Sequence, residues 1–429
     1  MNGARVHLKW NRSYWVFSIF FFVHYFGFSS VMSLFGIWLG QAVGLDGTEK
    51  GIVFAINSLG TLCFHLLYGY ISDKIGLRKH LLSVIIGLLM LAGPFFQFVY
   101  SPLLHSNIWL GALAGSIYIG ATFSSGNASI ESVIEKISRL KAFEYGKARM
   151  FGSLGWAVAT FFAGQTFNRN PNWNFWICSC TALLLAFLLL RTKLANASAG
   201  EEGSGDEPKS SEPFRFADIG RLSRNRKFWA FILYIVGVMC LVPVYDQQFP
   251  VYFSSLFETK EAGNRMYGYL NSVQVFAEAL CMFLAPALIN KIGPKRGLLL
   301  GGVLMFIRIS VSGMVDGPLE VGATKMIQAL ELPVMLISIF KYIRLNFDLR
   351  VASTLYLVGY QFTGALGGSI MSPLAGSLYD RIGFSHTYLW MAGYVLLFTL
   401  IAAFALSGGE RETGQGMLYR ASSETVTKR

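Results

Sequence analysis

The segment Asn127-ASIESVIEKISRLKAFEYGKARMFGSLG-Trp156 decides how this chain folds. Two largely apolar stretches flank a polar turn near Leu140, a pattern that predicts an antiparallel helical hairpin. Glu131 and Arg149 lie about nine residues before and after the turn, so both should lie at similar depth, roughly 13 Å from it. Trp156 lies two helical turns beyond Arg149, farther from the polar turn and on the same face of the helix. An acid, a base and a flat aromatic surface on one cavity would suit a polyhydroxylated ligand.

The composition is that of a membrane protein. Of 429 residues, 53% are hydrophobic and 14% are charged, and the mean hydropathy is +0.48. Soluble domains carry about 25% charged residues. The net charge of +12 would suggest a nucleic-acid partner in a soluble protein, but we attribute it to basic loops on one side of a bilayer. We therefore expect no nucleic-acid partner. The Cys and His residues show no metal-ligand spacing, so we also expect no metal and no cofactor.

Apolar runs long enough to cross a bilayer, about 20 residues each, form two sets. The first set lies near 14–39, 47–71, 80–100, 107–135, 145–166 and 173–190, and the second near 228–254, 266–289, 297–314, 320–340, 351–378 and 384–406. A charged stretch rich in Gly, Ser and Pro separates them. We therefore predict an all-α membrane protein of twelve transmembrane helices in two pseudo-symmetric halves, 1–192 and 228–408, with a linker at 193–227 and a tail at 409–429.

The distribution of basic residues predicts the orientation. With both termini in the cytoplasm, most of the 36 Lys and Arg residues fall on the cytoplasmic side of the bilayer. The outer segments hold Lys50, Arg169, Lys260, Arg265 and Arg381. The first span lacks a cleavage pattern, so we expect a retained helix rather than a signal peptide.

Several charged residues fall inside the predicted spans. They are Glu131, Arg149, Asp246, Glu278, Arg308, Lys325 and Glu331. A charge at this depth costs roughly 3 kcal/mol or more unless it is paired or hydrated, so each one marks a functional pathway by default. A structural ion pair between two helices is the alternative for any single residue. So many charges across different spans favour a transport pathway.

A loop between the second and third spans resembles a known signature. Gly69-YISDKIGLR-Lys79 fits G-x-x-x-D-[RK]-x-G-x-[RK]-[RK], the loop motif of the major facilitator superfamily. We assign Gly69, Asp73, Gly76 and Arg78 to an inner gate, where the aspartate would accept hydrogen bonds. Ala285-PALINKIGPK-Arg296 repeats the pattern in the second half, as expected of transporters built from repeats. We interpret the similar segment Gly376-SLYDRI-Gly383, on the outer side, as an ordinary turn.

Four further segments carry a more specific resemblance. They are Phe143-EYGKARMFGSLG-Trp156, Val244-YDQQ-Phe249, Lys325-MIQALEL-Pro333 and Phe340-KY-Ile343. Through them the chain resembles the oligosaccharide/proton symporters of bacterial inner membranes, which include the lactose, raffinose and sucrose permeases. The resemblance runs from about Trp15 to Leu406, apart from the linker. It implies a monomer in the lipid bilayer that transports a disaccharide together with protons.

In the first half, the resemblance implies that Glu131 and Arg149 contact sugar hydroxyls and that Trp156 stacks on a pyranose ring. The residue types agree with this, because a guanidinium binds paired acceptors and an indole suits apolar C–H faces. Asn127, one turn before Glu131, could add a hydrogen bond to sugar or simply pack between helices. Both interpretations of Asn127 stay open.

In the second half, the resemblance implies a structural charge pair and a proton-coupling pair. Asp246 and Lys325 match the pair that braces two helices. Arg308 and Glu331 match the coupling pair, in which Glu331 binds and releases the proton. An apolar setting favours the neutral form of a Glu, and an approaching Arg favours the ionised form, so conformation could control the proton.

The chain departs from the galactoside-type pattern at several positions. Gln328 stands where those permeases have a His, one turn before Glu331; it can hydrogen-bond but cannot carry a proton. Either the His is dispensable or coupling is weak, and we favour the first. Pro243 and Gly364 replace both partners of a second charge pair, which leaves no unpaired charge.

The eighth span bears on the identity of the sugar. Val275 occupies the position of a galactoside-type Glu, while Gln274 and Glu278 resemble the sucrose permeases. Trp156, by contrast, is typical of galactoside-type members. We therefore predict that Gln274, Glu278 and Gln328 contact the sugar.

We predict a proton-coupled symporter that imports a disaccharide by alternating access, with sucrose preferred. A galactoside symporter for lactose, melibiose or raffinose is the alternative. A proton/drug antiporter would have a more apolar cavity, and a non-transporting sugar sensor would normally carry a signalling domain. We expect no enzymatic activity, because no nucleophile–base arrangement is visible.

Overall fold

The structure is a computed structural model that describes residues 12–75, 79–141, 143–191, 225–347 and 355–407. Most of the predicted linker and all of the predicted tail lie outside these residues, as do Gly76 and Arg78 of the predicted inner gate. Gly69 and Asp73 lie within a helix, but their side chains are not described. The inner-gate assignment and the domain boundaries therefore stay predictions.

The first half is built from helices α1 to α10. Their bounds are α1 Arg12–Met32, α2 Phe35–Gln41, α3 Gly47–Ile75, α4 Lys79–Met90, α5 Ala92–Pro94, α6 Ser101–Ser106, α7 Ile108–Ile119, α8 Ser125–Leu140, α9 Tyr145–Arg169 and α10 Trp173–Arg191. Two π-helical segments, η1 Phe95–Tyr100 and η2 Gly120–Ser124, interrupt this series. Apolar runs fold as helices in lipid because only a helix satisfies its backbone polar groups internally.

The second half follows the same rule. It comprises α12 Arg226–Tyr234, α13 Leu241–Ser255, α14 Lys260–Ile292, α15 Pro294–Met314, α16 Pro318–Asn346 and α18 Thr363–Ala405, with π-helical segments η3 Ile235–Met239 and η4 Leu355–Phe362. Among the described residues, nine helical stretches are long and apolar enough to span a membrane, or ten if the bent pair at 81–106 counts as one.

Two features reconcile this count with the predicted twelve crossings. The stretch Val358–Ala405 holds 48 residues, and Gly383 within it has a φ of 78°, so the chain turns back there. The α9 helix, with 25 residues, is long enough to cross as well, although Lys147 and Arg149 make it more polar than the helices counted above. The predicted all-helical membrane fold is confirmed.

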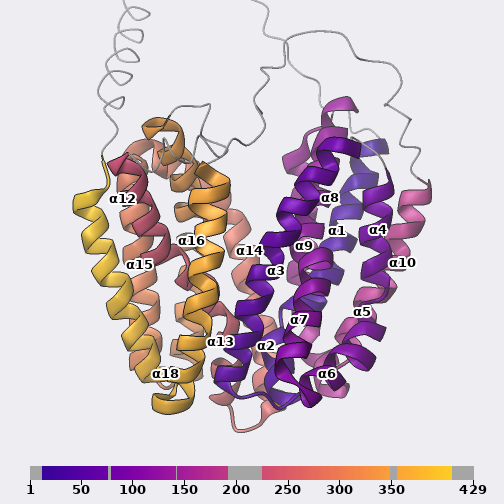
Figure 1. The fold of residues 1–429 in the computed structure, drawn as a ribbon, viewed down its shortest axis with the longest axis horizontal. Helices are drawn as coiled ribbons and strands as arrows, with labels where there is room; N and C mark the ends of the chain where they lie inside the picture. Colours follow the sequence, from indigo (N-terminus) through magenta and orange to yellow (C-terminus); the bar gives the residue numbers. More distant parts are fainter. Residues whose placement is uncertain (1–11, 76–78, 142, 192–224, 348–354, 408–429) are drawn as a thin grey trace, which may run out of the picture.

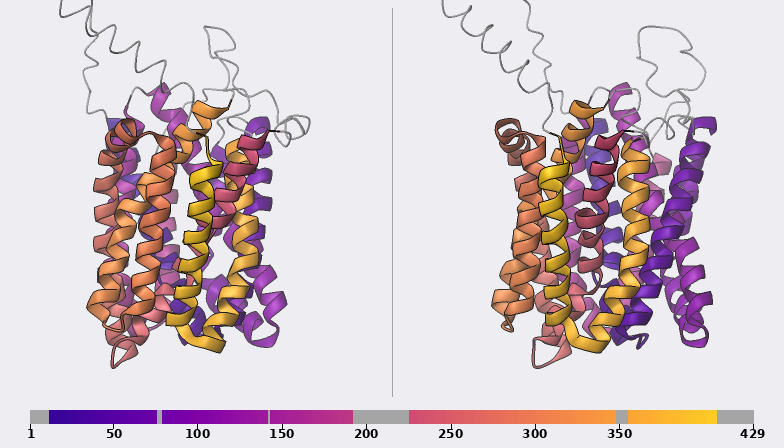
Figure 2. Two further views of the ribbon diagram at one scale, coloured as in Figure 1. Left: turned by 90° about the vertical axis from the view of Figure 1, so that its left-hand side faces the viewer. Right: turned by 60° about the vertical axis from the view of Figure 1, so that its left-hand side comes forward.

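The helices form two bundles that converge at one end. Figure 1 shows α1 to α10 on one side and α12 to α18 on the other, with the bundles splayed near the labels of α8 and α12. They approach one another near α2 and α13, which we call the closed end, and Figure 2 shows the helices running along one common direction. Contacts between the halves run mainly from α3 to α18 and from α9 to α14.

Glycines allow the close approach at the closed end. A Cβ on Gly47 of α3 would lie 2.8 Å from the carbonyl oxygen of Gly376 in α18. In the other contact, a Cβ on Gly268 of α14 would lie 2.6 Å from the carbonyl oxygen of Thr160 in α9. No real side chain tolerates such distances, so small residues are required wherever these backbones touch.

Hydrogen bonds between the halves complete the closed end. Gln41 and Asn264 exchange two bonds through their side-chain amides, at 3.1 and 2.9 Å. The buried side chain of Gln248 donates to the carbonyl oxygen of Gly47 at 3.0 Å. These contacts join the first half to α13 and α14 of the second.

Asp380 corrects the interpretation of 376–383 as an ordinary turn. Its carboxylate accepts from the backbone N–H groups of Gly47 and Thr48, at 2.8 and 2.7 Å, and from the Thr48 hydroxyl at 2.6 Å. An anion there satisfies N–H groups that lack partners inside the helix and complements the positive N-terminus of α3. Asp380, near the bend of α18 in the second half, thus caps a helix of the first half.

We predict that Asp380→Ala loosens the closed end. Losing about 1 kcal/mol from these exposed, charge-assisted bonds should raise the population open at this end about fivefold. Pulsed electron paramagnetic resonance between spin labels at the exposed Asn170 and Asp316 would report this as a longer-distance component. The exposed Glu258, changed to Ala, serves as control. Identical distance distributions for Asp380→Ala and wild type would show that the cap does not hold this end.

Candidate functional site

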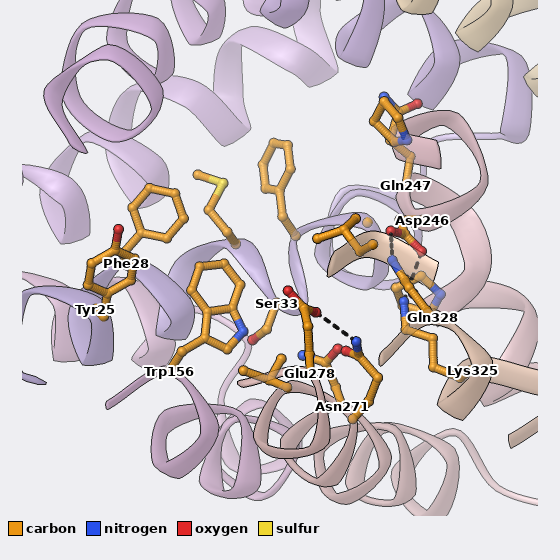
Figure 3. A pocket seen from close by; sticks show the side chains of 18 of the residues that line it. Tyr25, Phe28, Ser33, Trp156, Asp246, Gln247, Asn271, Glu278, Lys325 and Gln328 are labelled. Carbon is orange, nitrogen blue, oxygen red and sulfur yellow. Dashed lines mark hydrogen bonds and ion pairs between the residues drawn. The ribbon is translucent and has the colours of Figure 1, made fainter. Parts of the chain in front are cut away.

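A central cavity of about 640 Å³ lies between the two halves. Its wall includes Tyr25, Phe28, Asn127, Arg149 and Trp156 from the first half and Asp246, Asn271, Gln274, Glu278, Lys325 and Gln328 from the second. In Figure 3, the aromatic side chains of the first half lie opposite Asp246, Lys325 and Gln328. A ligand in this cavity would contact both halves, so its binding could be coupled to their relative movement.

The predicted hairpin brings Glu131 and Arg149 into contact. Arg149 Nε donates to Glu131 Oε1 at 2.5 Å, and both side chains are about 30% exposed. The Tyr25 hydroxyl also donates to Glu131 Oε1, and the Arg149 guanidinium lies 4.0 Å from the centre of the Tyr25 ring. Arg149 and Tyr25 line the cavity, whereas Glu131 is not part of its wall in this conformation. Glu131 therefore orients the residues that face the cavity.

Trp156 presents its indole to the cavity from an aromatic setting. Its ring centre lies 5.2 Å from that of Phe28 and 6.4 Å from that of Tyr25. Neighbouring rings hold the indole in place from behind, while its remaining face lies toward the cavity in Figure 3. The geometry provides an apolar platform of the kind that C–H faces of a pyranose contact.

Asn127 combines the two roles left open by the sequence. It lines the cavity, and its side-chain oxygen Oδ1 lies 3.0 Å from Nε2 of the buried His24. His24 thus fixes the orientation of the amide. The amide N–H₂ group of Asn127 is then available as a donor toward the cavity.

Arg308 and Glu331 form a fully buried ion pair. Arg308 Nε donates to Glu331 Oε2 at 2.7 Å and Arg308 Nη2 donates to Oε1 at 3.0 Å, with both side chains 0% exposed. The guanidinium also lies 4.3 Å from the centre of the Tyr245 ring. A bidentate, charge-assisted pair of this kind is among the strongest contacts that a guanidinium and a carboxylate can make.

Asp246 joins this buried pair to the cavity. Lys325 Nζ donates to Asp246 Oδ1 at 2.8 Å, and Gln328 Nε2 donates to Oδ2 at 2.5 Å. Arg308 Nη1 lies 3.7 Å from Oδ1, an ion-pair distance too long for a hydrogen bond. The two charge pairs predicted separately therefore share one network, and Gln328 connects it to the cavity wall.

Gln274 and Glu278 lie together on the other side of the cavity. Gln274 Nε2 donates to Glu278 Oε2 at 2.9 Å, and both side chains line the wall. Asn271, three residues before Gln274, adds a third polar group on the same face of α14. Helical spacing could have identified Asn271 from the sequence. No sequence signal distinguishes Tyr25 or Ser33, which also line the cavity, from other residues of the first span.

Among the described residues, no group of three or more His, Cys, Asp or Glu side chains is placed to hold a metal ion. The inner-gate repeat in the second half does show a contact: Lys341 Nζ donates to Asn290 Oδ1 at 2.5 Å. Asn290, at the position of the motif's aspartate, therefore links α14 to α16.

Comparison with known proteins assigns the chain to a family. Residues 6–417 match the family described as LacY proton/sugar symporter. The chain belongs to this family. It is 43% identical over 410 residues to the melibiose permease of Enterobacter cloacae, covering 95% of this chain and 96% of that protein. It is 42% identical to the raffinose permease of Escherichia coli, covering 95% of each.

Two further comparisons bear on substrate and fold. The sucrose permease of Escherichia coli is 36% identical over 404 residues, covering 94% of this chain and 96% of that protein. The crystal structure of the nucleoside transporter NupG superposes with a TM-score of 0.76 at 12% identity, covering 93% of this chain and 100% of that one. The second likeness concerns the fold alone. The relatives of this family member are permeases rather than enzymes, as the sequence predicted.

We predict that Asp246→Ala strongly destabilises this family member. The change would leave the buried Lys325 without its ion pair and take one of two partners from Arg308. Breaking a buried pair on one side costs roughly 3–5 kcal/mol. Thermal unfolding in detergent would measure the loss.

The double variant Asp246→Ala, Lys325→Ala is the informative control. Removing both charges leaves Arg308 paired with Glu331, so the double variant should unfold at a higher temperature than Asp246→Ala alone. A double variant less stable than the single would mean that Lys325 has no need of Asp246.

Proposed function

We propose that the protein imports a disaccharide together with protons by alternating access between its two halves. One observation carries the proposal. A cavity lined by side chains that could bind a sugar lies beside the fully buried ion pair of Arg308 and Glu331. Arg149 and Trp156 offer hydrogen bonds and an apolar face, and Asp246 connects the cavity wall to Arg308 and Glu331. Membership in a proton/sugar symporter family supports the same activity.

We infer that the splayed end faces the cytoplasm of a bacterial inner membrane. Lys and Arg residues gather in the segments at that end, as the positive-inside rule requires. The closed end, held by Asp380, Gln248 and Asn264, then faces outward. In this orientation the central cavity is open to the inside, and both termini are cytoplasmic.

The proposed cycle assigns the proton to Glu331. When Glu331 is protonated, its pair with Arg308 loses its Coulomb attraction, and sugar binding lets the halves rock. When the cavity opens inward, sugar leaves, Arg308 approaches Glu331, and the carboxyl releases its proton. The conformation in which Glu331 and Arg308 are paired corresponds to the end of this cycle.

We propose sucrose as the preferred sugar, with galactosides as the second candidate. The polar pair Gln274 and Glu278 favours sucrose, through the resemblance of the eighth span to the sucrose permeases. Trp156 and the higher identity to the melibiose and raffinose permeases favour a galactoside. The two candidates differ in the ring that would lie against α14, so that wall should decide between them.

Proton coupling is tested in de-energised cells. Addition of a transported sugar should alkalinise the weakly buffered medium, because each sugar enters with a proton. Glu331→Gln, which cannot release a proton, should abolish the alkalinisation and active accumulation while sugar exchange across the membrane continues. Sugar entry by wild type with no alkalinisation would identify a facilitator and refute the coupling.

The sugar is tested with a radiolabelled panel of sucrose, lactose, melibiose, maltose and raffinose, with Glu278→Gln beside wild type. We expect sucrose to accumulate most. Glu278→Gln should lower sucrose affinity about tenfold, because a hydrogen bond to a charged group is worth roughly 1.5–3 kcal/mol. Sucrose uptake near background together with strong accumulation of a galactoside would show that the galactoside, and not sucrose, is the preferred substrate.

A further inference from the structure

A second cavity of about 410 Å³ adjoins the central one. The two share part of their walls, formed by Met32, Phe35, Phe54, Pro243, Gln247 and Leu332. Pockets that enclose small ligands range over roughly 300–1,000 Å³, so the second cavity is ligand-sized in its own right. We call it the second chamber.

The wall of the second chamber is largely apolar, and the polar side chains in it are uncharged. Its side chains include the amides of Asn57, Gln247 and Gln361, the phenol of Tyr360, and the hydroxyls of Ser58, Thr61 and Ser124. No Asp, Glu, Lys or Arg belongs to the described wall of this chamber, whereas Arg149, Asp246, Glu278 and Lys325 line the central cavity. Neutral donors and acceptors suit a neutral, hydroxylated ligand and give no reason for an ion to enter.

Asn57 brings a largely buried amide to the wall of the second chamber. Its side chain is 92% buried at the chamber wall, since its exposed fraction is 8%. Within the described part of the chain, its amide oxygen Oδ1 accepts no hydrogen bond. The side chain of Asn57 also interacts with the buried Tyr100 hydroxyl, so it offers the chamber the hydrogen-bonding capacity that Tyr100 leaves free.

The backbone around the chamber is also unusual. Ser124, Met239 and the pair Tyr360 and Gln361 come from η2, η3 and η4, so three π-helical segments contribute to one wall. Single π-helical turns occur frequently at functional sites, because the extra residue redirects nearby side chains. Here they converge on the same space from both halves of the protein.

The chamber is open because its wall carries small residues. Gly364 and Gly368 of α18 line it, and a Cβ on Gly364 would meet its nearest neighbour, Ile235 Cγ2, only at 3.8 Å. For Gly368 the nearest atom is the Cys240 carbonyl oxygen at 3.9 Å. Unlike the glycines of the closed end, these two are not forced by backbone contact. Their effect is to leave space.

We propose that the second chamber binds a third sugar ring, so that the protein accepts trisaccharides whose first two rings occupy the central cavity. The chain would pass the shared wall, where Phe35 and Phe54 offer rings for the apolar faces of the sugar. Gln247 belongs to both cavities and could hydrogen-bond on either side of the passage. This inference rests on the proposed sugar transport and extends it to substrate length.

Raffinose is the suitable probe. It contains the galactosyl–glucose unit of melibiose and the glucosyl–fructose unit of sucrose, so it adds one ring to whichever disaccharide the central cavity accepts. Uptake of radiolabelled raffinose, melibiose and sucrose is measured in cells that express the full chain. Wild type should accumulate raffinose as well as at least one of the two disaccharides.

The side chain added by Gly364→Leu would fill the chamber and should therefore impair transport of the trisaccharide alone. We expect the KM for raffinose to rise at least about tenfold, the equivalent of losing one or two hydrogen bonds, while the disaccharide KM changes less than about twofold. Asn57→Leu, which removes the amide at the chamber wall, should shift the two KM values in the same selective way. Gly393→Leu is the control: Gly393 lies beyond the turn at Gly383, in the other arm of α18, is exposed, and would have no atom within 4 Å of an added Cβ.

The possible outcomes separate the two proposals. Disaccharide accumulation with background raffinose uptake in wild type would overturn the third-ring site and leave the proposed function intact. Equal loss of raffinose and disaccharide in Gly364→Leu, with Gly393→Leu normal, would also overturn it. If wild type accumulates none of these sugars, the proposed function fails and the third-ring site fails with it.

Discussion

The Arg308–Glu331 pair is the interaction on which the rest of the structure depends. Both side chains are fully buried within helices long enough to span a membrane, where an unpaired charge is strongly unfavourable. Neither can lose its partner without either a proton transfer or a movement that brings another charge close. The only other ion-pair partner of Arg308 among the described residues is Asp246, which itself holds Lys325 and Gln328. Contacts among side chains therefore connect Glu331 to the cavity wall through Arg308 and Asp246.

The closed end is built on a different physical basis. Its contacts are glycine backbones, amide pairs and one carboxylate that caps a helix, and each is weak compared with a buried ion pair. Weak contacts suit an interface that must open in every cycle. The strong interactions stay within the second half, between α13, α15 and α16, and need not break when the halves separate. Energetically costly charges and a reversible gate are thus kept apart in space.

The same energetics explain which features of the fold and site are predictable from the sequence. Charges within apolar runs are costly and therefore conspicuous, so Glu131, Arg149, Asp246 and Arg308 stand out from their sequence positions alone. The helical hairpin and the spans could be predicted from the lengths of the apolar runs and from the polar segments between them. The contact of Asp380 with α3 could not be predicted, because it joins residues more than 300 positions apart and the sequence around Asp380 resembles a simple turn. The link between Arg308 and Asp246 depends in the same way on how three helices pack.

The neutral polar residues were the least predictable part of the site. Tyr25, Asn57 and Gln247 carry no charge, and in sequence they differ little from residues that face lipid or pack between helices. Their importance appears only when helices from both halves bring them to a common space. This division has a physical rationale. If the proposed coupling at Glu331 and the proposed third-ring site are both correct, charges are needed near the carboxylate but not in the second chamber, where a charge would act on Glu331 through the low-dielectric interior.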